Sequence, residues 1–486
     1  MRCNKQEDNK EDNKEDNKDK EIMILTYAFV FLFLGLIIYI AHFVYADREN
    51  MINNSYNPRQ EILANQTLRG RILSADEQVL AESTITSGEK QTRDYPYDNL
   101  FAQVVGFQSH GRMGIESFAN YNLITSDIPM KMKAANELKG KKNPGNDVFT
   151  TLDVELQKVA SDALGVYEGA VIVMEPSTGK ILAMVSKPDF DPNKIDTIWE
   201  DLINDDSSTV LLNRVTQGLY PPGSTFKIVT ALEYIRENPD TYETYHYDCT
   251  GKFQLEDGKI RCYHGTKHGS EDLTKAFAKS CNSAFAQIGS TLDHVSFQKT
   301  LHQLLFQESL PLEFTYRNSI VALDENTQES DMVQMAIGQG ESQITPIHMA
   351  MITSAVANHG TVMDPYVVDR IENAEGTLIK QNNPTAYGTI MTQKESEILT
   401  HLMTEVVESG TGRKLSDLSY TAAGKTGSAE YNEVKEDSHA WFTGFAPAQN
   451  PQVVVTLIVE GAGSGGDYAV PIAKRIFDAY FERHLS

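Results

Sequence analysis

Residues 22–46 contain no Asp, Glu, Lys or Arg, and most of their side chains are large and apolar. As a helix this segment would rise about 37 Å, which is enough to cross a bilayer with some tilt. A buried helix of a globular domain would rarely lack charge on every face. A cleaved signal peptide is the stronger alternative, because residues 44–46 (Val-Tyr-Ala) resemble a cleavage site, but its apolar core usually spans only about 7–15 residues. We therefore predict a retained transmembrane anchor over residues 22–46.

The segment before this anchor, residues 1–21, repeats Glu-Asp-Asn-Lys three times and has almost no apolar side chains to bury. Such a composition predicts a disordered tail. Six Lys or Arg residues precede the anchor, whereas only Arg48 and Arg59 occur in a comparable stretch after it. Because the flank richer in Lys and Arg usually stays in the cytoplasm, we expect a cytoplasmic tail and an extracytoplasmic chain beyond residue 46.

The whole chain has 486 residues, 41% of them hydrophobic, which is enough for two or three globular units. Its formal net charge of −24 argues against nucleic acid as a partner, because binding to phosphates needs a basic surface. Residues 47–148 are polar and loop-rich, with strand-like pieces at 70–73 and 79–81, and the basic stretch 139–145 resembles a linker. We predict a small β-rich domain over 47–148 and a larger domain over 149–486.

The larger domain has strand patterns at its beginning and at its end. A 3.6-residue period predicts a helix at 154–164, and everything between the early and late strands reads as helices and loops. This order predicts an α+β domain with one five-stranded antiparallel sheet flanked by helices. The five expected strands are 170–174, 180–185, 421–429, 439–445 and 453–459.

The pattern Ser-x-x-Lys pairs a nucleophile with a base when both residues lie on one face of a helix. The chain contains it four times, beginning at Ser87, Ser177, Ser224 and Ser296. Ser224 alone follows a Pro-Pro-Gly turn and opens a helix, apolar around most of its circumference, that ends before Pro239. A serine that only caps this helix is the alternative. The context favours Ser224 and Lys227 as a nucleophile and its base at the polar tip of a buried helix.

Two further short motifs carry polar groups that suit the same chemistry. Ser280-Cys281-Asn282 interrupts two amphipathic segments, so we expect a tight loop between helices, with an N-cap as the alternative interpretation. Lys425-Thr426-Gly427, followed by Ser428, lies on the first late strand. An edge-strand lysine beside a bulge glycine is the alternative there.

In this order, and on a helix, a loop and a strand, the three motifs resemble those of the penicillin-binding protein and serine β-lactamase superfamily. Glu175 to Lys180 (Glu-Pro-Ser-Thr-Gly-Lys) and Gly338-Gln-Gly-Glu are similar to class B penicillin-binding proteins, as are His-Ala-Trp at 439–441 and Gly-Phe-Ala-Pro at 444–447. Residues 70–73 and 114–116 resemble the non-catalytic pedestal domain of that class. One departure is Ser428, where the family often has threonine.

The resemblance implies a role for each motif residue and requires no cofactor and no metal. Ser224 would attack the substrate, and Lys227, its pKa lowered by burial and by the charge of Lys425, would accept the proton. Ser280 would relay a proton to the leaving group, and Asn282 would hold Lys227 and the substrate amide. The carboxylate of the substrate would meet an exposed strand edge formed by Lys425, Thr426, Gly427 and Ser428, and the backbone N–H groups of Ser224 and Ser428 would form the oxyanion hole.

The resemblance also implies a substrate and a partner. The substrate would be the D-Ala-D-Ala end of a peptidoglycan stem peptide, and β-lactams would acylate the same serine. Only about 100 residues separate the anchor from the larger domain, too few for a glycosyltransferase domain. Glycan polymerisation would therefore fall to a multi-spanning glycosyltransferase of the shape, elongation, division and sporulation type.

Three alternatives keep the same motifs: a membrane-anchored β-lactamase, a D-Ala-D-Ala carboxypeptidase and a non-enzymatic β-lactam receptor. Rapid hydrolysis needs a carboxylate that activates water, which class A β-lactamases carry in a Glu-x-x-Leu-Asn loop. Residues 283–424 lack this pattern, and Glu313 and Asn318 come nearest to it. A receptor needs an inward signalling device, for which a 21-residue tail is short.

Of the four cysteines, Cys3 precedes the anchor, and Cys249, Cys262 and Cys281 follow it. A hairpin-like stretch separates Cys249 from Cys262, so these two could form a disulfide. A zinc site with His264 and His268 would have irregular ligand spacing. We favour unpaired thiols that pack as small apolar side chains.

Overall fold

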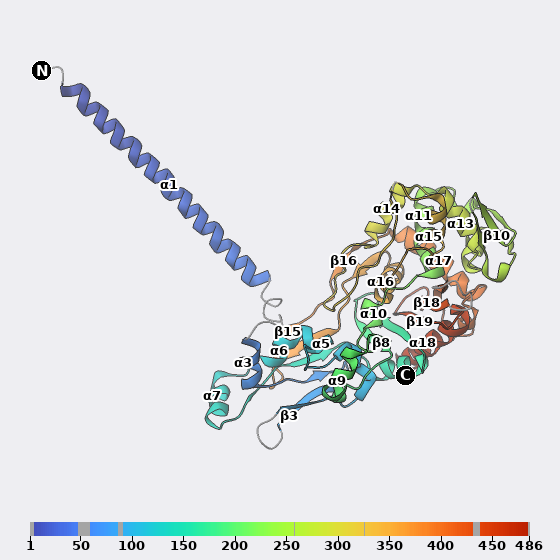
Figure 1. Cartoon of the computed structure of the whole chain (residues 1–486), viewed down its shortest axis with the longest axis horizontal. Coiled ribbons are helices and arrows are strands. Elements are labelled where there is room, and N and C mark those ends of the chain that lie inside the picture. The colour runs from blue at the N-terminus through green and yellow to red at the C-terminus, as the bar shows by residue number, and fades with distance from the viewer. Residues whose placement is uncertain are drawn as a thin grey trace. The chain divides into compact units, whose positions relative to one another are not determined.

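The computed structural model describes residues 4–46, 59–85, 91–256, 258–324, 326–430 and 438–484 (Figure 1). The chain divides into two compact units, Met1–Ile62 and Leu63–Ser486.

The first unit is dominated by a single helix, α1 (Asn4–Ala46). Within the described residues, its part Lys20–Tyr45 is the one helix long and apolar enough to cross a membrane, and its side chains are not buried within the protein. The helix also takes in residues 4–21, for which the sequence predicted disorder. The anchor nucleates the helix, and propagation into a tail rich in Lys and Glu costs little. Residues 1–3 lie outside the described residues.

A six-stranded sheet lies in the N-terminal part of the second unit, with the strand order β15-β14-β6-β2-β3-β4. β2 and β3, which lie at the predicted strand-like pieces, pair in antiparallel fashion, and β2 runs parallel to β6. β6 crosses the predicted boundary at residue 148 and pairs on its other side with β14, more than 200 residues further along the chain. The predicted linker is also packed, since Asn143 and Pro144 of β5 pair with β1. The six strands of the sheet are β2 (Ile72–Leu73), β3 (Val79–Ile85), β4 (Gln91–Asp94), β6 (Asp147–Thr150), β14 (Val368–Glu372) and β15 (Leu378–Gln381). The separate two-stranded pair consists of β1 (Thr67–Leu68) and β5 (Asn143–Pro144).

The predicted five-stranded antiparallel sheet is confirmed, with the order β17-β18-β19-β7-β8. Alternate residues of its central strands enter two separate cores: Val171 and Val173 face α8 and α18, whereas Ala170 and Ile172 face the side covered by α16. Two-residue periodicity therefore places a helical layer on each face. These elements are β7 (Gly169–Met174), β8 (Ile181–Lys187), β17 (Ala423–Glu430), β18 (Ser438–Ala446), β19 (Val453–Val459), α8 (Val154–Leu164), α16 (Pro346–Ala357) and α18 (Val470–His484).

The expectation of only helices and loops between the early and late strands was wrong. Beside β14 and β15, the described part of this region contains six short strands of three or four residues, paired into three ladders. These strands are too brief and too polar to show an alternating pattern. They are β9 (Tyr247–Cys249), β10 (Lys252–Leu255), β11 (Gly258–Arg261), β12 (Gly269–Glu271), β13 (Thr361–Met363) and β16 (Ala386–Thr389).

The remaining helices connect these sheets, and α11, α13, α14 and α15 gather at one end of the second unit (Figure 1). The α-helices are α3 (Arg59–Gln66), α4 (Ala102–Val105), α5 (Gly114–Phe118), α6 (Asn120–Ile124), α7 (Met130–Leu138), α9 (Ile195–Asn204), α10 (Arg214–Gln217), α11 (Lys227–Glu237), α12 (Leu273–Ala278), α13 (Asn282–Thr291), α14 (His294–Gln303), α15 (Glu329–Ala336) and α17 (Gln393–Glu408). The short 3-10 and π segments are η1 (Asp98–Phe101), η2 (Pro192–Lys194), η3 (Gly223–Phe226), η4 (Tyr242–Thr244), η5 (Tyr263–Gly265), η6 (Arg413–Leu415) and η7 (Gly465–Ala469).

Candidate active site

Ser224 lies in η3, the tight turn that leads into α11. Its side chain is half-buried and caps neither segment, because the N-cap residues are Pro222 and Phe226. Within the described part of the chain, its hydroxyl forms no hydrogen bond. The structure therefore does not support a capping role, and it leaves the Ser224 hydroxyl available for chemistry.

The turn that carries Ser224 is held from several sides. The Gly223 N–H donates to the Gly338 carbonyl at 2.9 Å, and the Trp441 indole N–H donates to the Pro221 carbonyl at 3.0 Å. Gly338 has a positive φ of 79°, and a Cβ there would lie 1.8 Å from the Gly223 oxygen. Only glycine permits this close approach. Phe226 is fully buried and anchors the start of α11 in the core.

The Lys227 side chain is fully buried and points its ammonium group at the predicted inter-helix loop. Its Nζ donates to the Ser280 carbonyl at 2.8 Å, to Asn282 Oδ1 at 2.7 Å and to Ser280 Oγ at 3.3 Å. Among the described residues its hydrogen-bond partners do not include Ser224. Burial lowers the pKa of Lys227 to about 8. A lysine with this pKa can release a proton near neutral pH.

The predicted loop between α12 and α13 contains Ser280 in a left-handed conformation, with a φ of 56°. Such a φ is unfavourable for a residue other than glycine and is concentrated at functional sites. Ser280 is not the N-cap of α13. That position belongs to Cys281, whose sulfur accepts a hydrogen bond from the Ala284 N–H. The Asn282 side chain is held at both polar atoms. Its Nδ2 donates to the Arg261 carbonyl at 3.1 Å, and its Oδ1 accepts the hydrogen bond from Lys227 Nζ.

Lys425 lies on β17, the edge strand of the five-stranded sheet, and reaches the same loop. Its Nζ donates to Ser280 Oγ at 3.0 Å and to the Thr426 carbonyl at 3.1 Å. Burial, followed by the charge of Lys227, holds the pKa of Lys425 well below its usual range. Ser280 Oγ thus accepts hydrogen bonds from both lysines, and each ammonium group disfavours protonation of the other.

The expectation of an exposed strand edge needs correction, because Lys425 is fully buried and Thr426 nearly so. The Thr426 hydroxyl pairs with the Thr411 hydroxyl at 2.5 Å, and Ser428 Oγ accepts a hydrogen bond from the Gly465 N–H at 3.3 Å. A Cβ at Gly427 would lie 3.1 Å from the Pro222 oxygen. The edge of β17 is therefore covered by the turn that carries Ser224, and this packing could not be derived from strand periodicity.

The other Ser-x-x-Lys motifs lie elsewhere in the fold. Ser177 occupies the turn between β7 and β8, and Ser296 lies within α14, where its N–H donates to the Asp293 carboxylate. Ser87 lies outside the described residues. The structure thus brings Lys227, Ser280, Asn282 and Lys425 into one hydrogen-bonded group and packs the Ser224 turn against β17.

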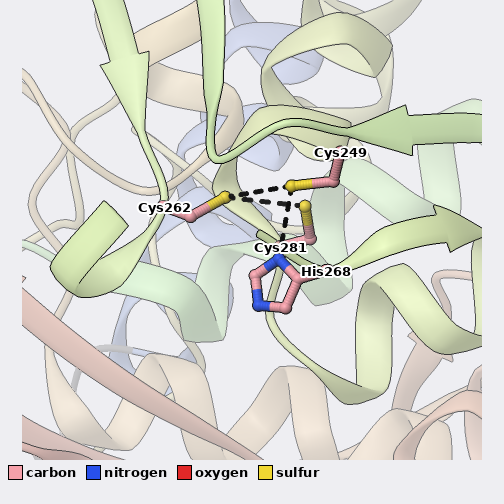
Figure 2. A group of neighbouring side chains, drawn as sticks. All are labelled: Cys249, Cys262, His268 and Cys281. Atoms are coloured by element: carbon pink, nitrogen blue, oxygen red, sulfur yellow. Dashed lines mark hydrogen bonds between the residues drawn. The ribbon is translucent and has the colours of Figure 1, made fainter. Parts of the chain in front are cut away.

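A second polar cluster adjoins this group and was not predicted as a unit. Figure 2 shows the sulfurs of Cys249, Cys262 and Cys281 and the ring of His268 directed at one point. Their potential ligand atoms all lie within 4.8 Å of one another. Cys249 and Cys262 are not disulfide-bonded, since their sulfurs are 3.7 Å apart. The sequence interpretation missed this set because Cys281 was assigned to the Ser280 loop. Cys3 lies outside the described residues.

A serine three residues before a buried lysine of lowered pKa, with a second lysine on a sheet edge, is the arrangement expected in an enzyme that forms an acyl-serine intermediate. The family model of the penicillin binding protein transpeptidase domain matches residues 169–478, and that of the penicillin binding protein A dimerisation domain matches residues 69–148. The chain belongs to the penicillin-binding proteins, as a member of their class B.

Named relatives agree with this assignment. The peptidoglycan D,D-transpeptidase PbpA of Mycolicibacterium smegmatis is 32% identical over 451 residues, which are 86% of this chain and 90% of the relative. The peptidoglycan D,D-transpeptidase MrdA of Haemophilus influenzae is 30% identical over 438 residues, which are 82% of this chain and 67% of the relative. Among solved structures, the imipenem acyl-enzyme complex of penicillin-binding protein A from M. tuberculosis is 28% identical, with a TM-score of 0.79 and coverage of 86% of this chain and 99% of the other.

Proposed function

We propose that this protein is a membrane-anchored peptidoglycan D,D-transpeptidase that cross-links stem peptides through an acyl-enzyme at Ser224. The observation that carries this proposal is the pair of buried lysines that share Ser280 Oγ, together with a Ser224 hydroxyl that has no hydrogen-bond partner among the described residues. Relatives named peptidoglycan D,D-transpeptidases and β-lactam acyl-enzyme structures of the same fold support it.

In the acylation step, the Ser224 oxygen attacks the carbonyl carbon of the terminal D-Ala-D-Ala bond, and its proton passes to neutral Lys227. The backbone N–H groups of Ser224 and Ser428 stabilise the oxyanion, a contribution of about 3–4 kcal/mol per donor. Ser280 returns a proton to the departing D-alanine nitrogen, and a Ser224 ester remains. An acceptor amine then attacks the ester, forms the cross-link and regenerates the serine.

The two lysines suit different steps of this sequence. The substrate carboxylate favours the charged form of Lys425, to which it binds. Because the two ammonium groups converge on Ser280 Oγ, a charged Lys425 in turn favours neutral Lys227, the form that acts as the base. Substrate binding therefore favours the neutral form of Lys227, which acts as the base.

Gly427 lets the substrate backbone approach β17, and the Ser428 hydroxyl contributes a second contact to the substrate carboxylate. The Thr426 hydroxyl must first exchange its bond to Thr411.

We also propose that the chain consists of a cytoplasmic tail (1–21), an anchor (22–46), a pedestal domain (47–148) and a transpeptidase domain (149–486). The two family models support this division, since one ends at residue 148, within β6, and the other begins at residue 169, the first residue of β7. The uneven distribution of Lys and Arg around the anchor supports an extracytoplasmic catalytic domain. A multi-spanning glycosyltransferase partner would supply the glycan strands that this enzyme cross-links.

The test is covalent labelling of the full-length protein with fluorescent penicillin. Ser224→Ala should abolish the label, and Lys227→Ala should prevent acylation, whereas Ser177→Ala and Ser296→Ala should leave the label intact. Ser87→Ala should also be silent. Label that survives in folded Ser224→Ala protein would refute the nucleophile.

Mass spectrometry of the intact protein separates a transpeptidase from a β-lactamase. A transpeptidase gains from excluding water, since hydrolysis would waste the acyl-enzyme before the amine arrives. We expect the penicilloyl adduct to outlast its formation by orders of magnitude after a short penicillin pulse. Loss of the adduct within seconds, with steady turnover of penicillin, would instead identify a membrane-anchored β-lactamase.

A further inference from the structure

We propose that Cys249, Cys262, His268 and Cys281 bind a Zn²⁺ ion, and that this ion holds the Ser280–Asn282 loop in its working position. The metal site stands on geometry alone. Its effect on acylation rests on the function proposed above.

The spacing of the four side chains fits tetrahedral zinc. With Zn–S bonds near 2.3 Å and Zn–N bonds near 2.0–2.1 Å, a tetrahedron has edges of about 3.8 Å between sulfurs and about 3.6 Å from sulfur to nitrogen. The Cys249–Cys262 and Cys262–Cys281 sulfur pairs are each 3.7 Å apart, and Cys249 Sγ lies 3.4 Å from His268 Nδ1. A disulfide needs about 2.05 Å. Three thiolates and an imidazole are soft donors that select zinc over Mg²⁺ or Ca²⁺.

The segment around the cluster has little else to hold it together. Among the described residues from 247 to 271, only Cys249, Gly251, Cys262 and Glu271 are buried. The strands β9 to β12 form two-stranded ladders of three or four residues each. Such short ladders are marginal without a core or a metal. A zinc ion would tie β9, the end of β11 and the start of β12 to α13.

A buried carboxylate beside the cluster points to a nearby positive charge. Glu271 is 2% exposed, neither of its oxygens has an N–H or O–H donor among the described residues, and it lies beside the Cys281 thiol and near the charge of Lys227. An isolated buried carboxylate is costly. A metal ion bound to Cys281 and His268 would add to the positive charge that Lys227 places near this carboxylate.

Two of the four ligands adjoin the catalytic group directly. Cys281 lies between Ser280 and Asn282, and Cys262 follows Arg261, whose carbonyl accepts the Asn282 amide hydrogen bond. A metal bound to both cysteines fixes the two backbone segments that orient Asn282. Asn282 Oδ1 in turn lies 2.7 Å from Lys227 Nζ. Cys262 and Cys281 are therefore positioning residues for the base.

The metal is tested by elemental analysis of the full-length protein purified in detergent without added zinc. We expect about one zinc ion per chain in the wild type. Cys249→Ser, Cys262→Ser and His268→Ala should lose it, whereas Cys3→Ser and the exposed neighbour His264→Ala should keep it. Replacement by Co²⁺ should give the thiolate charge-transfer bands and intense visible absorption of a tetrahedral site. Native protein without zinc, in which Cys249, Cys262 and Cys281 are all alkylatable or Cys249 and Cys262 form a disulfide, would overturn the site.

The coupling is tested by the rate and the final extent of penicillin labelling. Removal of zinc with a chelator, or His268→Ala, should slow acylation about 10–100-fold, the usual effect of losing a supporting contact at a metal or catalytic centre. The final extent of labelling should be retained, because the nucleophile is intact. Zn²⁺ but not Mg²⁺ should restore the rate of the stripped wild type. An unchanged rate after stripping would overturn the coupling, and so would a loss of labelling extent alone. If the wild type is never acylated, the proposed function fails, while the zinc content still decides the metal site.

Discussion

Raising the pH from 6 to 8 should accelerate the acylation of Ser224 by penicillin, because only neutral Lys227 can accept the serine proton. With the pKa of Lys227 lowered to about 8 by burial, its neutral fraction rises from about 1% at pH 6 to about one-half at pH 8, a roughly 50-fold increase. The rate should level off above pH 8. A lysine with an ordinary pKa near 10.4 would still be less than about 1% neutral at pH 8, and the rate would continue to climb about tenfold per pH unit.

The contribution of Lys227 to folding stability cannot produce this rise in the acylation rate between pH 6 and 8. The pKa of Lys227 falls from 10.5 in the unfolded chain to about 8 in the folded one, which corresponds to a cost of about 3 kcal/mol for the buried charge. Below pH 8 both states are protonated, so Lys227 destabilises the fold by a constant amount. Between pH 8 and 10.5 the unfolded chain binds more protons, and stability increases as the pH rises.

The assay is the second-order rate constant for labelling of the full-length protein with fluorescent penicillin, measured at constant ionic strength. The unfolding temperature at each pH serves as the control. A rate that is flat between pH 6 and 8, or one that rises without a plateau to pH 10, would refute Lys227 as the base.

Two further predictions concern the geometry of the site, and a third concerns the topology of the chain. Asn282→Ala removes the oxygen that accepts a 2.7 Å hydrogen bond from Lys227, so the midpoint of the same pH profile should fall by about one unit even as the rate decreases; an upward shift would contradict this. Gly338→Ala would place a methyl group 1.8 Å from the Gly223 oxygen, whereas Gly340→Ala shares the positive φ but meets nothing closer than 3.7 Å. Acylation should therefore drop at least about tenfold in the first variant and much less in the second, and equal losses would show that backbone strain alone matters. Protease added to intact spheroplasts should remove the chain beyond the anchor and spare the tail, and protection of the catalytic domain would reverse the proposed topology.

Elements with a long, regular pattern could be predicted from the sequence. The anchor is uncharged over 25 residues, and α8 carries a helical period. The central sheet strands β7 and β19 are short, continuous apolar runs that are buried on both faces. These signals are local, because each depends only on the pattern of apolar residues within one element. The same local context distinguished Ser224 from the other Ser-x-x-Lys serines, since a turn and a buried helix are both visible in a short window.

Contacts between distant segments were not predictable in this way. The burial of Lys425, its hydrogen bond to Ser280 across 145 residues, and the pairing of β14 with β6 depend on how whole elements pack. Cys249, Cys262, His268 and Cys281 come from two short ladders and a helix start, none of which has a periodic pattern. The sequence by itself determined the long apolar helix, the five-stranded sheet and the residues that we propose as reactive groups. Only the tertiary structure decided their burial and mutual distances, because desolvation and close approach arise when segments far apart in the chain exclude water together.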